Sequence, residues 1–233
     1  MNATNVVINA KDSAEIASNI TANNNVNITA GNGVTFTESA NTASNQGTAV
    51  NVGIGAGATI NVETGVAVPH VNGSVGVNKT DNASSTATGA NVAAGNDIKI
   101  NANNGDVNLH GTNLVSNNSV EVEGNKVNTS GAISSVNEKN LTVNVNGSYA
   151  SGKPNGGINA KGKNEANVTN TANTIQSDNV VITTGSPTGL SVNNTTINGN
   201  NVAYYYDDSK APAANRYTYR SRQPSYAKRR LRY

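Results

Sequence analysis

Residues 19–39 read NITANNNVNITAGNGVTFTES, and this stretch decides the fold. It contains two apolar pairs, Val26/Ile28 and Val34/Phe36, each with one polar residue inside the pair and with Asn and Gly between the pairs. Alternation with a period of two is typical of a short β-strand with one buried face, and Asn and Gly are typical of turns. The stretch therefore predicts short strands joined by tight turns.

Similar pairs recur along the chain at a nearly constant distance. Ile8 and Ile28 are 20 residues apart, Ile98 and Val120 are 22 apart, and Val120 and Leu141 are 21 apart. Such a repeat is typical of a β-solenoid, in which each rung buries its apolar pair only against the next rung. We predict an all-β solenoid with rungs of about 20–22 residues. Helical periodicity is absent outside Lys11–Ser18. The pairs that support the repeat are Val6/Ile8, Val26/Ile28, Val34/Phe36, Ile98/Ile100, Val107/Leu109, Val120/Val122, Leu141/Val143 and Val180/Ile182.

Asparagine is the most unusual feature of the composition, with 44 Asn and 23 Gly among 233 residues. Asn side chains at equivalent turns of a solenoid can stack and hydrogen-bond along the axis, and Asn tolerates the left-handed backbone of sharp corners. Six Asn-Gly pairs predict tight turns; they begin at Asn32, Asn72, Asn104, Asn146, Asn155 and Asn198. The alternative is a low-complexity linker, which would not place Val and Ile in phase.

The composition also excludes several classes of protein. The chain has no Cys, which excludes disulfides, thiolate metal sites and cysteine nucleophiles. It has no Trp, and Phe36 is its only Phe, so a core anchored on aromatic rings is not expected. No apolar run approaches the roughly 18 residues of a membrane helix. The first residues lack the basic and apolar regions of a signal peptide.

Residues 48–78 alternate for longer than one rung requires. Val50, Val52 and Ile54 are followed by further alternating Val and Ile residues among Gly, Asn and Ala. We interpret this insertion as a possible β-hairpin projecting from the solenoid, with Pro69 and His70 near a turn or edge. A hairpin that inserts into a membrane is the alternative, although the usual aromatic belt is absent.

The small net charge of +2 hides an asymmetry between two parts of the chain. Residues 1–203, the solenoid body, contain 8 basic and 12 acidic residues, whereas residues 204–233 contain 8 basic and 2 acidic residues and seven of the eight Tyr. Arg and Tyr together are typical of binding to nucleic acid or to anionic surfaces. An extension without a fold or a selected role is an equally good interpretation of this tail. The candidate contacts are Arg216, Tyr217, Tyr219, Arg220, Arg222, Arg229, Arg230 and Arg232.

Two stretches resemble a known family. Residues 19–39 and residues 87–112, ATGANVAAGNDIKINANNGDVNLHGT, resemble the haemagglutinin-repeat region of filamentous haemagglutinin-like two-partner secretion exoproteins. The resemblance covers about residues 1–150. The family includes adhesins and contact-dependent inhibition proteins. It implies a right-handed parallel β-helix in a virulence-associated rod, exported to the extracellular space or outer-membrane surface of a Gram-negative bacterium. The family's secretion domain and a toxin domain are not recognisable, so the chain is expected to be a fragment, a truncated paralogue or a remnant.

Catalysis has little support in the sequence. Glu121 and Glu123 are the only close acidic pair of the body, and they fit a solvent-facing stripe better than a pair of catalytic carboxylates. His70 and His110 are forty residues apart and have no partners at metal-ligand spacing. We therefore expect no enzyme activity, no cofactor and no metal.

Three functional hypotheses remain. The first is a structural and adhesive segment that contacts glycans or proteins on host or neighbouring cells. The second is the stalk of a contact-dependent inhibition or toxin-delivery exoprotein, served by an outer-membrane transporter. The third, less favoured, is a carbohydrate-active β-helix enzyme. Uncapped end rungs additionally predict end-to-end self-association.

Overall fold

The structure is a computed structural model that describes residues 1–207. All regular secondary structure in these residues is β, so this part of the chain contains no helix long and apolar enough to cross a membrane. The chain forms two compact units. We call the first the β-helix; within the described residues it comprises Met1–Asn41, Thr86–Ser134 and residues 169–207. We call the second the arm; it comprises Thr42–Ser85 and Ser135–Val168.

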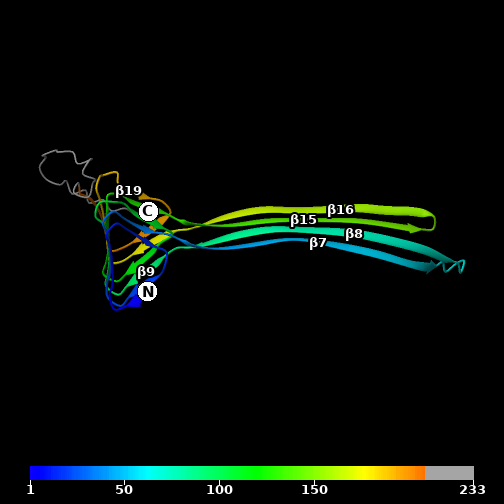
Figure 1. Ribbon diagram of the computed structural model, residues 1–233, viewed down its shortest axis with the longest axis horizontal. Helices are drawn as coiled ribbons and strands as arrows, with labels where there is room; N and C mark the ends of the chain where they lie inside the picture. The colour runs from blue at the N-terminus through cyan, green and yellow to red at the C-terminus, as the bar shows by residue number, and fades with distance from the viewer. Residues whose placement is uncertain (208–233) are drawn as a thin grey trace. The chain divides into compact units, whose positions relative to one another are not determined.

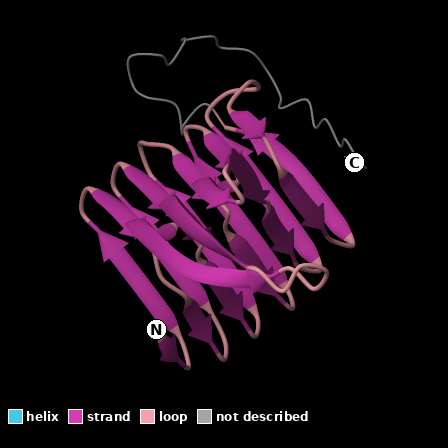
Figure 2. Cartoon of the chain, turned by 90° about the vertical axis from the view of Figure 1, so that its right-hand side faces the viewer, coloured by secondary structure: helices cyan, strands magenta, loops and turns pink. Residues whose placement is uncertain are grey.

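The β-helix consists of successive rungs of three short strands, as the repeat predicts. Six rungs fall within the described residues, the last with two strands (Figure 2). In chain order they are β1 (Asn2–Ala3), β2 (Val6–Ala10) and β3 (Ser13–Ile16); β4 (Ile20–Ala22), β5 (Val26–Ala30) and β6 (Gly33–Phe36); β9 (Asn91–Ala94), β10 (Asp97–Ala102) and β11 (Val107–His110); β12 (Asn113–Ser116), β13 (Ser119–Gly124) and β14 (Val127–Ser130); β17 (Asn173–Gln176), β18 (Asn179–Thr184) and β19 (Leu190–Val192); and β20 (Thr195–Asn198) and β21 (Asn201–Tyr206).

Equivalent strands of successive rungs form three parallel sheets. The first sheet has the order β1-β4-β9-β12-β17-β20, the second β2-β5-β10-β13-β18-β21, and the third β19-β14-β11-β6-β3. All of their pairings with a recorded register are parallel. The prediction of a parallel β-helix is therefore confirmed.

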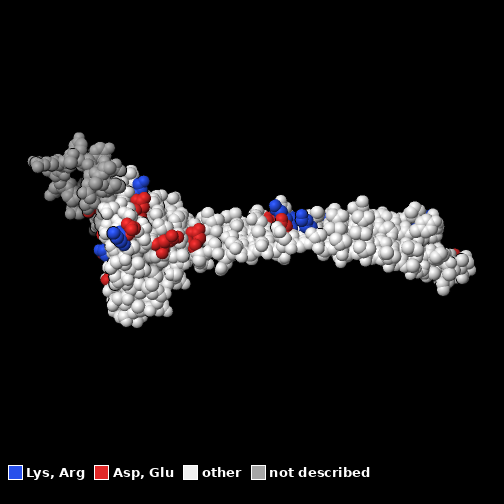
Figure 3. Space-filling view, in the orientation of Figure 1, with Lys and Arg blue, Asp and Glu red and all other residues white. Residues whose placement is uncertain are grey.

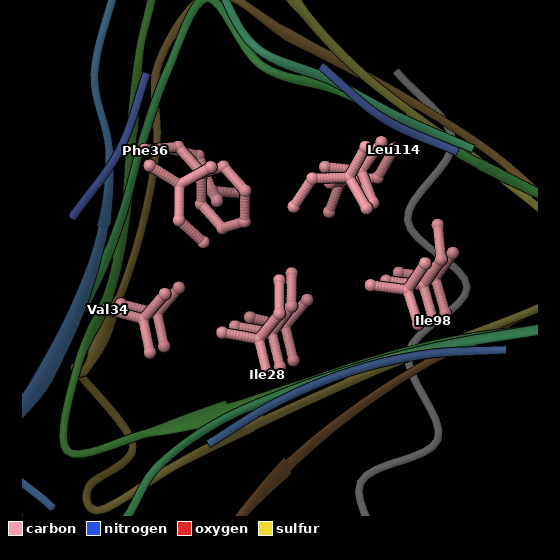
Figure 4. Packing of buried hydrophobic residues seen from close by; sticks show 14 of the residues in the cluster. Ile28, Val34, Phe36, Ile98 and Leu114 are labelled. Atoms are coloured by element: carbon pink, nitrogen blue, oxygen red, sulfur yellow. The ribbon is translucent and has the colours of Figure 1, made fainter. Parts of the chain in front are cut away.

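The core lies between the three sheets, and it is built of stacked identical or similar side chains (Figure 4). Ile28 is registered with Ile8 on one side and with Ile100 on the other. Phe36 and Leu114 come from the third and first sheets and are fully buried. Each fully buried side chain of this size contributes about 1.5–3 kcal/mol, so a rung is stabilised chiefly by the rungs above and below it.

The arm is a four-stranded antiparallel sheet made of two hairpins (Figure 1). Its strands are β7 (Ser39–Ile60), β8 (Ala67–Thr88), β15 (Ala132–Ala150) and β16 (Lys153–Thr171), in the spatial order β16-β15-β8-β7. Ser151 and Gly152 join β15 to β16 with φ values of 54° and 77°, the left-handed pair that a two-residue hairpin turn of the primed type requires.

The long insertion is a hairpin, but it exceeds the predicted range of 48–78. Its strands run from Ser39 to Thr88, and the turn lies between Ile60 and Ala67, where the amide of Gly65 donates to the carbonyl of Asn61. Pro69 and His70 lie near the start of β8, close to this turn. The turn prediction was wrong for the Asn-Gly pairs at Asn72, Asn146 and Asn155, which lie inside arm strands.

The second hairpin corrects the predicted repeat. Leu141 and Val143 lie in β15 of the arm and do not form a rung. The register partner of Val120 on the following rung is Val180. Both segments alternate apolar and polar residues, so their spacing alone did not distinguish them. Two smaller differences from the prediction remain. Ser13–Ile16 forms strand β3, although the sequence does not exclude helical periodicity there, and β21 continues to Tyr206, past the predicted boundary of the body at residue 203.

Candidate interaction surfaces

Asn ladders join the rungs at the corner between the first and second sheets. The backbone amide of Asn25 donates to Oδ1 of Asn5 (3.2 Å), and the backbone amide of Asp97 donates to Oδ1 of Asn25 (3.3 Å). Further along the stack, Nδ2 of Asn201 donates to Oδ1 of Asn179 (3.0 Å). Corner positions that repeat from rung to rung therefore explain part of the Asn content, as predicted.

A second polar column runs along the outer face of the third sheet. Thr35, Asn108 and Asn128 are in register on β6, β11 and β14. Nδ2 of Asn128 donates to Oδ1 of Asn108 (3.0 Å), and Nδ2 of Asn108 donates to Oγ1 of Thr35 (3.4 Å). Because parallel strands are about 4.8 Å apart, this column repeats uncharged donors and acceptors at that interval.

Asn173 is a buried polar residue at the point where the second hairpin returns to the β-helix. Its Oδ1 accepts from the amide of Thr112 (2.7 Å), and its Nδ2 donates to the carbonyl of Ser130 (2.8 Å) and to Oγ1 of Thr195 (3.2 Å). The side chain is fully buried. It satisfies the buried backbone amide of Thr112, whereas the carbonyl of Ser130 also accepts from the backbone amide of Gly111.

Glu121 and Glu123 lie on the outer face of β13, as the predicted solvent-facing stripe requires. Oε2 of Glu121 forms an ion pair with Nζ of Lys99 at 3.2 Å, on the adjacent rung. Both side chains are substantially exposed, so this pair adds at most about 1 kcal/mol to stability. Within residues 1–207, no three His, Asp or Glu side chains gather into a possible metal site.

The two histidines have unrelated surroundings. His110, at the end of β11, shares a hydrogen bond of 2.6 Å between its Nδ1 and Oγ of Ser130 on the neighbouring rung. His70 lies in β8 of the arm, where its ring occupies the space left by Gly57 of β7. Each histidine therefore has a local packing role.

One face of the arm is polar. Gly53, Gly55 and Gly57 of β7 leave room for side chains of the adjacent β8, because a Cβ at any of them would come within 2.5–2.8 Å of Ser74, Asn72 or His70, respectively. The same alternation places Asn144 of β15 beside Gly76 of β8 on this face.

The opposite face of the arm is apolar and exposed. Val75 is registered with Val145, and the alternation of β7 and β16 places Val52 and Ile158 on the same face. The exposed fractions of Val52, Val75, Val145 and Ile158 are 67%, 42%, 43% and 77%. We call this surface the apolar arm face; it comprises Val50, Val52, Ile54, Val71, Val75, Val77, Leu141, Val143, Val145, Tyr149 and Ile158.

Charged side chains are sparse on the arm, as one side of it shows in Figure 3. Nζ of Lys163 is 2.7 Å from Oε2 of Glu138 and 2.8 Å from Oε2 of Glu165. Hydrogen bonds to Glu138 and then Glu165 hold the pKa of Lys163 above its usual range. Glu138 is an even number of positions from Asn144 along β15, and it therefore lies on the polar face. Lys163 of β16 pairs with it on the same face.

The apolar arm face is what the sequence reasoning missed. A usable signal was present, because Leu141, Val143 and Val145 continue the alternation by one apolar residue beyond the pair Leu141/Val143 from which a rung was predicted. The predicted tail contacts, Arg216, Tyr217, Tyr219, Arg220, Arg222, Arg229, Arg230 and Arg232, lie outside the described residues and stay a prediction.

The comparisons with known proteins agree with this architecture. The model of the hemagglutinin repeat matches residues 71–205. No curated protein and no solved structure matches the chain significantly. The hemagglutinin repeat is a structural family and not an enzyme family, and it points to a secreted or surface exoprotein. Since the match spans more than half of the chain and includes the strands from β9 to β20, the chain belongs to the hemagglutinin repeat family of filamentous haemagglutinin-like proteins.

Proposed function

We propose that this chain is a structural and adhesive segment of an exported exoprotein on the surface of a Gram-negative bacterium. The observation that carries the proposal is the column of Thr35, Asn108 and Asn128 on the outer face of the third sheet. A glycan presents repeated hydroxyl groups that both donate and accept hydrogen bonds. A straight array of hydroxyl and amide groups matches this chemistry and needs no catalytic group.

The experiment is a binding assay with the full chain on glycan and matrix-protein arrays. Replacement of both Asn108 and Asn128 by Ala is expected to lower binding at least about fivefold, since each lost hydrogen bond contributes about 0.5–1.5 kcal/mol. The matched control is Thr183→Ala on the outer face of the second sheet, which should leave binding unchanged. Absence of binding by the unmodified chain to any glycan or matrix protein would reduce its role to that of a spacer.

The second candidate is the stalk of a contact-dependent inhibition or toxin-delivery exoprotein, exported through an outer-membrane transporter. It is favoured by the register between Val120 and Val180, which continues the stack across the second hairpin. A stalk needs this kind of continuity and needs no receptor. A toxin domain encoded in frame downstream, with a neighbouring immunity gene, would favour the stalk over the adhesive segment.

A further inference from the structure

We propose that the apolar arm face is a homodimer interface, which packs against the same face of a second copy of this chain. The four residues at its centre, Val52, Val75, Val145 and Ile158, form a row across all four strands. All four are at least 42% exposed. Apolar patches of this extent are rare on soluble monomers and mark surfaces that are covered by a partner.

The size of the face fits a dimer. Strands rise about 3.4 Å per residue and lie about 4.8 Å apart, so four strands over the length from Leu141 to Tyr149 cover about 600 Å². Two such faces bury about 1,200 Å² together, at the lower end of the range for specific protein interfaces, which is about 1,200–2,000 Å². Sheets pack face to face through interdigitating side chains about 10 Å apart, and branched side chains such as Val and Ile suit this packing.

Charge distribution also favours a second copy. On the same side of the sheet as the apolar arm face, charged residues of β8 and β15 occur only toward one end of these strands. They are Lys79, Asp81 and Lys139. The ion pairs of Lys163 with Glu138 and Glu165 lie on the other face of the sheet. Two copies related by a two-fold axis near Val75 and Val145 would therefore bury a surface whose one charged residue, Lys79, lies at its rim beside Leu141, and the two copies of Lys79 would lie at opposite ends of the interface.

A lipid surface is a poorer occupant for a single arm. Its reverse face carries Asn51, Asn144 and Asn159, and its outer strands β7 and β16 have one edge each without a neighbouring strand in the sheet. Hydrocarbon leaves such polar side chains and strand edges without hydrogen-bond partners. A second copy covers the apolar arm face and leaves the polar face and both edges in water.

The test is sedimentation of the full chain between about 1 and 100 µM, compared with Val145→Lys. The unmodified chain should sediment as a dimer of the 23.8 kDa chain. Val145→Lys places two like charges near the axis of the interface, and it should weaken dimerisation at least about 30-fold, the loss expected at the centre of an interface. Val145 is 43% exposed in the single chain, so the monomer should keep its circular dichroism spectrum.

The matched control is Asn144→Lys, which adds the same charge to the adjacent residue on the polar face and should leave dimerisation unchanged within about twofold. Flotation with phosphatidylcholine vesicles is measured in parallel. The proposal is overturned if the unmodified chain is monomeric at 100 µM, if both variants dissociate equally, or if Val145→Lys still dimerises through another surface. It is also overturned if the monomer floats with vesicles and Val145→Lys abolishes flotation.

Discussion

Val120 of β13 is paired in parallel register with Val180 of β18, although the whole second hairpin lies between them in sequence. The hairpin therefore leaves the stack at the end of one rung and returns at the start of the next without shifting the register. This arrangement makes the β-helix and the insertion separable, because the core of the β-helix contains no side chain from the stretch between Ala132 and Asn173.

Deletion of residues 132–172 tests this separability. It joins Gly131 to Asn173, and the new corner corresponds to Gly111 and Thr112, which connect two rungs without any insertion. We expect the shortened chain to unfold cooperatively by circular dichroism, with parallel stacking retained. A noncooperative transition, or loss of the β spectrum, would show that the hairpin is needed for the stack. A deletion that ends one residue later removes Asn173 and serves as the matched control, which should be much less stable.

Asn173 is expected to be among the most sensitive polar positions. Asn173→Ala leaves the buried backbone amide of Thr112 without its partner, whereas the carbonyl of Ser130 keeps its hydrogen bond from the backbone amide of Gly111. One unsatisfied buried group costs about 1–3 kcal/mol, so we expect a loss of about 2 kcal/mol in the free energy of unfolding, measured with urea. Asn113→Ala removes a more exposed ladder bond to Asn91 and should cost under about 0.5 kcal/mol. Equal losses in the two variants would contradict the role given to Asn173.

Gly105 is expected to tolerate no side chain. A Cβ at this position would overlap the carbonyl group of Asn32 on the preceding rung, and a backbone group cannot move aside as a side chain can. Gly105→Ala should therefore cost at least about 2 kcal/mol, measured by denaturant unfolding. The neighbouring Asn104 is exposed, so Asn104→Ala is the control and should have little effect. A Gly105→Ala variant as stable as the control would mean that the rungs are spaced more loosely than described.

The apolar pairs were predictable from sequence because burial repeats at every second residue of a strand, as at Val26 and Ile28. The strand that pairs with each of these strands was not predictable. Leu141 and Val143 carry the same alternation as Val120 and Val122, and only long-range pairing assigns the first two to the arm. Periodicity specifies which residues share a face of a strand, but it does not specify the neighbour of that strand.

The candidate surfaces were likewise predictable from sequence only in part. The Asn ladders followed from composition and turn chemistry, since Asn at equivalent corners has few other reasons to recur. The apolar arm face requires the register of four strands, which depends on two turns that the sequence reasoning did not place. Its apolar residues have even numbers in β7 and β16, such as Val52 and Ile158, and odd numbers in β8 and β15.

Tyr204 provides the last prediction, because composition assigned it to the basic tail whereas the structure places it in β21 of the β-helix. It continues the stack of Ile182, and its hydroxyl group bonds with Oγ1 of Thr184 (2.7 Å) and donates to the carbonyl of Ser186 (3.0 Å). Tyr204→Phe should therefore lower the free energy of unfolding by about 1–1.5 kcal/mol. Tyr205 is 45% exposed on the other face of the strand, and Tyr205→Phe should change stability by less than about 0.5 kcal/mol. If the two variants are equally stable in thermal and urea unfolding, Tyr204 does not tie the last strand to the stack, and the boundary at residue 203 would be the better description of the body.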